Sequence, residues 1–118
     1  MTTTRKEGHM APIYRQGDVL IVPVATIPAG TTKVKREHGR VVLAHGEVTG
    51  HHHSIAERGV QLVSKEEADE LRMWMTVTAP DPVELIHQEH DTILIPPGTY
   101  EVRRQREYAP EGIRNVAD

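Results

Sequence analysis

Residues 83–98 have the sequence VELIHQEHDTILIPPG, in which two short apolar segments are separated by a polar bend. In the first segment Val83, Leu85 and His87 alternate with Glu84 and Ile86, and this period of two is typical of a β-strand. The second segment ends at a Pro-Pro-Gly turn. A strand, a bend, a second strand and a turn in so short a stretch predict a fold built from short strands.

The same organisation continues along the chain. Further strands are expected over residues 18–24, 39–44, 60–63, 73–77 and 100–106. One short helix is expected to begin at Ser64, because Ser64 and Glu67 have the spacing of a capping box. Seven or so short strands at this spacing predict an all-β fold, a small jelly-roll barrel or sandwich with one short helix.

The chain has 118 residues, which fits one compact domain. We expect residues 1–11 to be a disordered lead-in, residues 12–108 to form the single β domain, and residues 109–118 to be a C-terminal tail. His9 is left out of any site, because Gly8-His9-Met10 resembles a cloning junction. Phenylalanine is absent and aromatic content is 3%, so the core must rest on Val, Ile and Leu.

The composition narrows the range of functions. With no cysteine, disulfides, thiolate nucleophiles and Cys-ligated zinc are excluded. The net charge of −3 gives no electrostatic reason to expect a nucleic-acid partner. The longest apolar stretch, residues 19–25, contains Pro23 and is too short to cross a bilayer. Because no signal peptide is evident either, we expect a cytoplasmic protein without a membrane partner, and homo-oligomerisation through sheet edges is plausible.

Histidines carry the clearest chemical signal. On a strand His51 and His53 share one face, and His87 lies on the expected core face of its own strand. His90 follows the next bend and could replace His87 or join it, whereas two glycines separate His45 from this group. Neutral imidazole is the commonest side-chain metal ligand. We therefore take His51, His53, His87 and His90 as candidate ligands of one divalent transition metal.

A simpler interpretation stands beside this one. A histidine run flanked by glycine also occurs as a solvated loop, because short His-rich tracts are only a compositional hint of metal binding. A histidine on a core face can equally be satisfied by hydrogen bonds within the protein. The sequence alone leaves both interpretations open.

Residues 46–57 resemble the first motif of the cupin superfamily. Gly46, His51, His53 and Glu57 stand at its motif positions, with the glycine one residue closer than in the family pattern. The resemblance implies a cupin-like double-sheet jelly roll that holds its metal inside the barrel.

Residues 90–98 are similar to the second cupin motif, in which Pro96 and Gly98 match. The metal-binding histidine of that motif is Glu101 in this chain. The resemblance therefore implies either that Glu101 takes the place of the ligand or that His87 or His90 supplies it.

Three functions follow from such a site. Three imidazoles and an open position suit zinc, which activates water, so the first hypothesis is a lyase or hydrolase that hydrates carbon dioxide or hydrolyses a small-molecule substrate. An extra histidine or Glu89 would then serve as base or proton shuttle. The second is a cupin-type oxygenase or isomerase with iron, manganese or nickel, which a bound carboxylate (Glu57 or Glu101) would favour. The third is a non-catalytic binding or assembly module, suggested by the basic run of residues 103–106.

Overall fold

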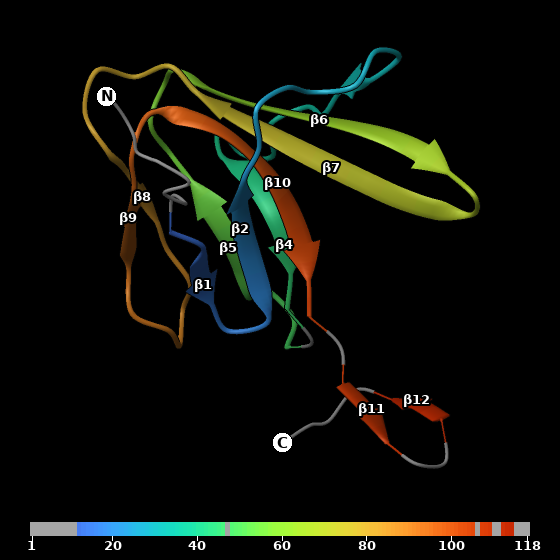
Figure 1. Ribbon diagram of the computed structural model, residues 1–118. Helices are drawn as coiled ribbons and strands as arrows, with labels where there is room; N and C mark the ends of the chain where they lie inside the picture. The colour runs from blue at the N-terminus through green and yellow to red at the C-terminus, as the bar shows by residue number, and fades with distance from the viewer. Residues whose placement is uncertain (1–11, 47, 106, 110–111, 115–118) are drawn as a thin grey trace.

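The computed structural model describes residues 12–46, 48–105, 107–109 and 112–114 (Figure 1). That part of the chain contains strands and no helix, so the expected all-β architecture is confirmed. The strands are β1 (Tyr14–Gln16), β2 (Val19–Pro23), β3 (Thr32–Lys33), β4 (Val41–His45), β5 (His52–Ile55), β6 (Val60–Glu67), β7 (Glu70–Val77), β8 (Val83–Leu85), β9 (Ile93–Ile95), β10 (Gly98–Arg104), β11 (Glu107–Ala109) and β12 (Gly112–Arg114).

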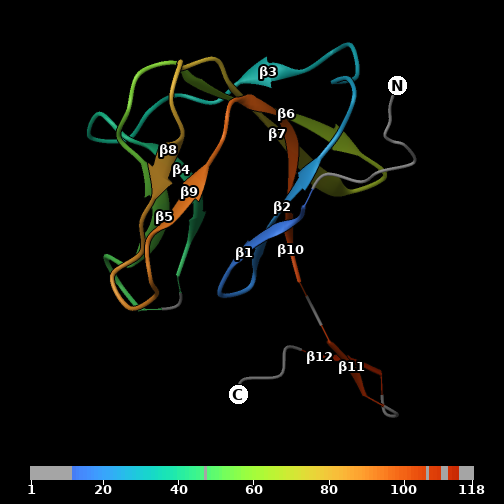
Figure 2. The ribbon, with the colours of Figure 1, turned by 60° about the vertical axis from the view of Figure 1, so that its left-hand side comes forward.

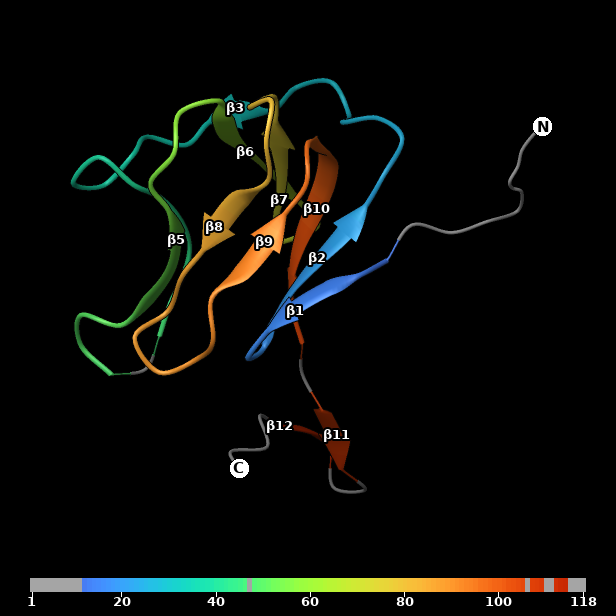
Figure 3. The same ribbon diagram turned by 90° about the vertical axis from the view of Figure 1, so that its left-hand side faces the viewer.

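The strands form two layers. The larger is a six-stranded antiparallel sheet in the order β1-β2-β10-β7-β6-β3. The second consists of the hairpins β4–β5 and β8–β9, which are joined where the backbones of Ser54 and Ile86 exchange two hydrogen bonds of 3.1 and 2.9 Å. Figures 2 and 3 show this second layer facing the larger sheet, which makes the fold a sandwich.

The core lies between the layers and is built by period-two alternation. Val19 and Ile21 of β2 are fully buried, as are Leu85 of β8 and Ile95 of β9. Branched aliphatic residues dominate this core, as the lack of phenylalanine requires. The strands expected over residues 18–24, 60–63, 73–77 and 83–87 are therefore present as β2, β6, β7 and β8, with bounds shifted by a few residues.

The expected helix is wrong. Residues 64–67 are the second half of β6, where Ser64 pairs with Met73 and Glu67 pairs with Glu70 of β7. Ala68 and Asp69 connect the two strands with φ of 50° and 66°, which is the backbone of a two-residue hairpin turn of type I′. A helix of two turns has little stability of its own, whereas pairing along eight residues extends a sheet whose other end is buried.

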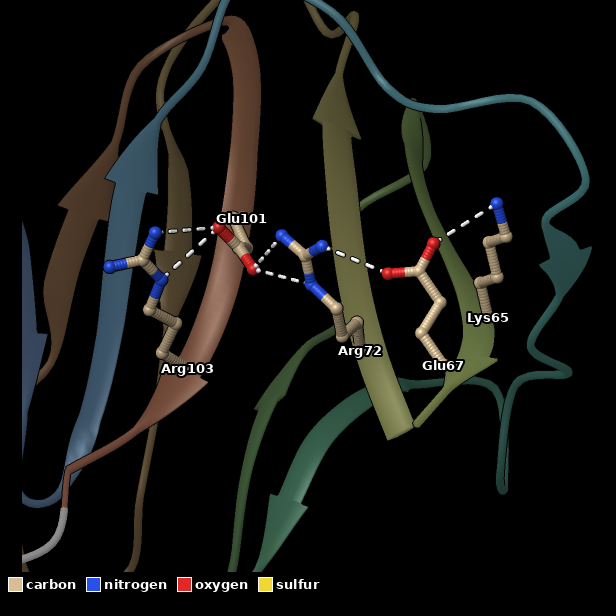
Figure 4. Close-up of polar contacts among 5 residues, drawn as sticks. All are labelled: Lys65, Glu67, Arg72, Glu101 and Arg103. Carbon is tan, nitrogen blue, oxygen red and sulfur yellow. Dashed lines mark hydrogen bonds and ion pairs between the residues drawn. The ribbon is translucent and has the colours of Figure 1, made fainter. Parts of the chain in front are cut away.

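Glu101 lies on the outer face of the large sheet, where it is only 6% exposed. Arg72 donates from Nε and Nη2 to its Oε2 at 3.2 and 2.9 Å, and Arg103 donates to Oε1 at 3.1 and 2.8 Å. Figure 4 shows this cluster continuing through Glu67, 3.0 Å from Arg72. The Arg72 guanidinium also lies 4.9 Å from the centre of the Trp74 ring. Burial raises the pKa of Glu101, but the two guanidinium groups outweigh burial and lower it.

The described residues end in a hairpin that pairs with neither layer. The expected lead-in, residues 1–11, lies outside the described residues. Strands β11 and β12 pair as a small hairpin across the boundary expected at residue 108 between the domain and the tail (Figure 1). None of the described segments is a helix long and apolar enough to cross a membrane.

The turn between β6 and β7 yields a first prediction. Replacing Ala68 by Gly relieves the cost of holding a Cβ at positive φ. We expect the free energy of unfolding to rise by roughly 0.5 to 1 kcal/mol, after allowance for the greater freedom of glycine in the unfolded chain. Urea unfolding followed by the fluorescence of Trp74, the only tryptophan, measures it.

Ala25→Gly is the matched control. Ala25 is exposed in the loop after β2 and does not have positive φ, so glycine there should lower stability by up to about 1 kcal/mol. An equal fall in the free energy of unfolding of the two variants would contradict the left-handed turn.

Candidate functional site

Four histidine rings meet at one end of the sandwich. His51 immediately precedes β5, His53 lies within it, and His87 and His90 follow β8. The centre of the His87 ring lies 4.3 Å from that of His53, 4.6 Å from that of His90 and 5.7 Å from that of His51. His53 and His90 are 6.0 Å apart with nearly parallel rings. The structure thus brings together all four histidines that were chosen from the sequence, which we call the histidine cluster.

His53 faces inward because it shares one face of β5 with the fully buried Ile55. The register between β4 and β5 shifts between Val42 and Ala44, so that Ala44 pairs with His53. The extra residue is Leu43 of β4, so this β-bulge bends β4 beside His53. His53 is 3% exposed.

The Gln16 side chain determines which nitrogen of His53 carries the proton. Its Nε2 donates to the carbonyl oxygens of Leu85 and Asp91 at 2.8 and 2.9 Å. Because both partners are acceptors, the amide oxygen must point the other way, and it lies 2.8 Å from His53 Nδ1. His53 Nδ1 therefore donates, and a neutral His53 has its lone pair on Nε2.

The cluster favours uncharged imidazoles. Burial, together with the nearby His87, His90 and Arg104, lowers the pKa of His53 to about 4 against the opposing effect of Asp18. Burial also lowers the pKa of His87, and the nearby His90 and His51 act in the same direction. Close imidazoles cannot all hold protons, so His53 and His87 are neutral at pH 7, which is the state that binds metals.

The turn between β1 and β2 forms one wall of the cluster. Gly17 has a φ of 59°, as the first position of a two-residue type II′ hairpin turn requires. A Cβ on Gly17 would lie 2.7 Å from Nε2 of His90, so only glycine lets this ring lie against the turn. Asp18 places Oδ1 3.8 Å from His53 Nε2, and its Oδ2 accepts from Arg104 Nε and Nη2, each at 2.9 Å.

Sequence reasoning missed Gln16, Gly17 and Asp18. The available signal was a Gly-Asp pair between two alternating segments, which is the pattern of a type II′ hairpin. That pattern predicts the turn, but it does not indicate which distant residues the turn meets.

Two other histidines do not join the cluster. The His45 side chain is 65% exposed, and its Nε2 lies 3.2 Å from Glu37. His52 points away from the cluster, and the Gln88 amide contacts both its backbone N at 2.8 Å and its ring Nε2 at 3.3 Å. Nδ1 of His52 is buried without a hydrogen-bond partner among the described residues, and nothing in the structure explains this.

The carboxylates suggested by the cupin resemblance lie elsewhere. Glu57 accepts a 3.0 Å hydrogen bond from the backbone of Glu84. Glu101 alternates with the core residues Tyr100 and Val102, so it faces the outer side of the sheet and is held by two arginines. The expectation that Glu101 replaces a histidine ligand is therefore wrong, because the alternation of β10 directs it away from the cluster.

The donor atoms of the cluster are not yet arranged around an ion. His87 Nδ1 accepts a 3.0 Å hydrogen bond from the backbone N–H of Glu89, so the proton of a neutral His87 is on Nε2. The described side chains contain no group of three or more His, Asp and Glu that could hold a metal ion as they stand. His87 can therefore act as a ligand only if the hydrogen bond from Glu89 breaks, so that its ring turns or its proton moves to Nδ1.

A hollow of about 370 Å³ lies apart from the cluster, between β3, β6 and β7. None of the four histidines lines it. The Arg36 side chain at its wall donates to four backbone carbonyls, those of Gly39, Ala56, Glu57 and Val60. This guanidinium supports the fold, and the histidine cluster is the better candidate for chemistry.

Comparison with known proteins gives one match. A family model, described as a domain of unknown function (DUF8820), matches residues 15–105. No curated protein and no solved structure matches the chain. The matched segment contains all four histidines of the cluster together with Gln16 and Asp18.

The lowered pKa of His53 makes a prediction about acid stability. Unfolding raises the pKa from about 4 to 6.5, so the unfolded chain binds more protons between these values. Stability is fully present above pH 6.5 and falls as the pH drops toward 4. Between about pH 7 and about pH 4.5 we expect this group to account for a loss of roughly 2 to 3 kcal/mol, measured by urea unfolding of metal-free protein.

His53→Asn should remove this part of the pH dependence. His45→Asn is the control, because His45 is exposed and should leave the profile unchanged. A His53→Asn profile parallel to that of the unmodified protein would show that His53 is not the residue responsible.

Proposed function

The chain belongs to the DUF8820 family, whose function is unknown, and we propose that its histidine cluster binds one divalent transition metal, zinc being favoured, and uses it to activate water. The observation that carries the proposal is the convergence of imidazoles from two separate segments, residues 51–53 and 87–90. The β1–β2 turn, more than thirty residues before His51 in the chain, lies against the same cluster and contacts His53 through Gln16.

The ring spacing supports this proposal. Imidazoles that share one tetrahedral zinc ion at about 2.0–2.1 Å per bond have ring centres roughly 5.2 Å apart. The ring centres of the cluster lie 4.3 to 6.0 Å apart. We propose that side-chain rotations, including a turn of His87, bring three donor nitrogens to one point when the metal binds.

The protonation of the cluster gives further support. A ligating imidazole is neutral and usually donates its other N–H to a protein acceptor, which fixes the ring. His53 has this arrangement, because its Nδ1–H bonds to Gln16 and its Nε2 is left for a ligand. The lowered pKa of His53 and His87 removes the competition between protons and metal near pH 7.

The chain also offers a group to move the proton. A bound metal ion supplies Lewis acidity, which lowers the pKa of a water molecule to about 7. Glu89 Oε2 lies 3.5 Å from His51 Nδ1 and is 65% exposed. His51 and Glu89 are thus placed to pass a proton from the site to solvent. The reaction class is hydration or hydrolysis of a small molecule, carried out by a lyase or hydrolase.

A cupin-type oxygenase or isomerase with iron, manganese or nickel is the second candidate. The observation that favours it is the Asp18 carboxylate beside His53 Nε2, since hard oxygen donors suit these metals. The relationship to cupins stays a prediction from the two sequence motifs.

Metal titration of tag-free protein, freed of metal by a chelator, tests the proposal. We expect one zinc ion per chain, and His53→Ala and His90→Ala should each lower zinc affinity at least about tenfold. His45→Ala should leave the affinity unchanged, because His45 lies outside the cluster. Isothermal titration calorimetry with a competing chelator measures the affinities, and circular dichroism checks that each variant is folded.

Two results would contradict the proposal. Protein that takes up no zinc, or a His53→Ala variant that binds zinc as well as the unmodified protein, would exclude a metal site at the cluster. Zinc binding without hydration of carbon dioxide or hydrolysis of a simple ester would leave the binding role and count against water activation.

A further inference from the structure

Two hydrogen-bond acceptors face each other at the edge of the histidine cluster. Gln16 holds the proton of His53 on Nδ1, so Nε2 presents a lone pair. Asp18 Oδ1 lies 3.8 Å from this nitrogen, beyond the reach of a hydrogen bond. No hydrogen bond from the described residues reaches His53 Nε2.

The negative charge of Asp18 makes its position beside the His53 lone pair unfavourable on its own. Arg104 donates twice to Oδ2 at 2.9 Å, which leaves Oδ1 directed at His53. A lone pair and a carboxylate oxygen repel each other unless something positive or proton-bearing lies between them. Protonating His53 Nε2 would satisfy both atoms, but burial of the ring opposes its positive charge.

The separation fits a shared ion. Two ligand atoms at about 2.1 Å from one metal ion lie roughly 3.0 to 4.2 Å apart, depending on the angle between the bonds. The 3.8 Å between His53 Nε2 and Asp18 Oδ1 falls inside this range. His90 approaches from the same side, because its Nε2 lies against Gly17, the residue before Asp18.

We propose that Asp18 is a metal ligand, so that the ion lies between Asp18 Oδ1 and His53 Nε2 and the ligand set combines imidazoles with one carboxylate. This inference rests on the proposed function, because it names a ligand of the same site. The carboxylate comes from the β1–β2 turn, a position that the cupin motifs do not include.

The mixed ligand set changes which metals the site prefers. Carboxylate oxygen is a hard donor that suits Mn²⁺ and Fe²⁺, and two histidines with one carboxylate and open positions are typical of non-haem iron sites. A site built only from imidazoles binds Mn²⁺ and Fe²⁺ less well relative to zinc. The Asp18 carboxylate therefore raises affinity for Mn²⁺ and Fe²⁺ relative to zinc.

Replacing Asp18 by Asn tests the inference with Mn²⁺ and Zn²⁺ as probes. Metal-free, full-length protein is titrated with Mn²⁺, and free aqueous Mn²⁺ is followed by electron paramagnetic resonance; zinc affinity is measured by competition. We expect Asp18→Asn to lower Mn²⁺ affinity at least about tenfold and Zn²⁺ affinity less, so that the ratio of the two affinities changes. Asp18→Ser serves in its place if Asn prevents folding, because serine also suits turns.

Arg104→Gln is the matched control. It removes the ion pair with Asp18 and keeps the carboxylate, so Mn²⁺ affinity should stay within a few-fold of the unmodified value. An equal Mn²⁺ loss in Arg104→Gln and Asp18→Asn would show that Asp18 acts only through Arg104 and would overturn the inference.

The two proposals fail in different ways. If the unmodified protein binds metal and Asp18→Asn binds Mn²⁺ and Zn²⁺ with unchanged affinities, Asp18 contacts only water and this inference is overturned while the metal site stands. If the unmodified protein binds neither ion, both proposals are overturned together.

Discussion

The amide of Gln16 is the interaction on which the arrangement of the cluster depends. Gln16 belongs to β1 at one edge of the large sheet, yet its three hydrogen bonds reach His53 of β5, Leu85 of β8 and Asp91 in the loop before β9. One buried side chain therefore connects the two layers at the end where the histidines lie. Its donors and acceptor match their partners in only one orientation, so it aligns the strands and sets the His53 tautomer at once.

The sandwich treats a buried carboxylate and its buried imidazoles differently. On the outer face of the large sheet, Glu101 is buried as an anion and balanced by Arg72 and Arg103. At the cluster end, burial and mutual proximity keep His53 and His87 neutral. The contrast follows from the neighbours: guanidinium groups stabilise a buried charge, whereas a second imidazole opposes it.

Local patterns predicted the strands and the membership of the cluster. The alternation of Val83, Leu85 and His87 holds because one face of β8 is buried, and the spacing of His51 and His53 holds because β5 is extended. The helix at Ser64 failed because its local signal competed with cross-strand pairing to β7. The roles of Gln16 and Asp18 could not be predicted, since their partners lie far away in sequence and only the packing of the two layers brings them together.

Gly17 joins two requirements at one position. The hairpin needs a residue that accepts positive φ, and His90 needs a surface without a side chain. An asparagine or aspartate could meet the first requirement alone, because these residues tolerate left-handed backbone, but its Cβ would displace the ring from its present place. A residue without any reactive group therefore sets how closely an imidazole can approach its neighbours.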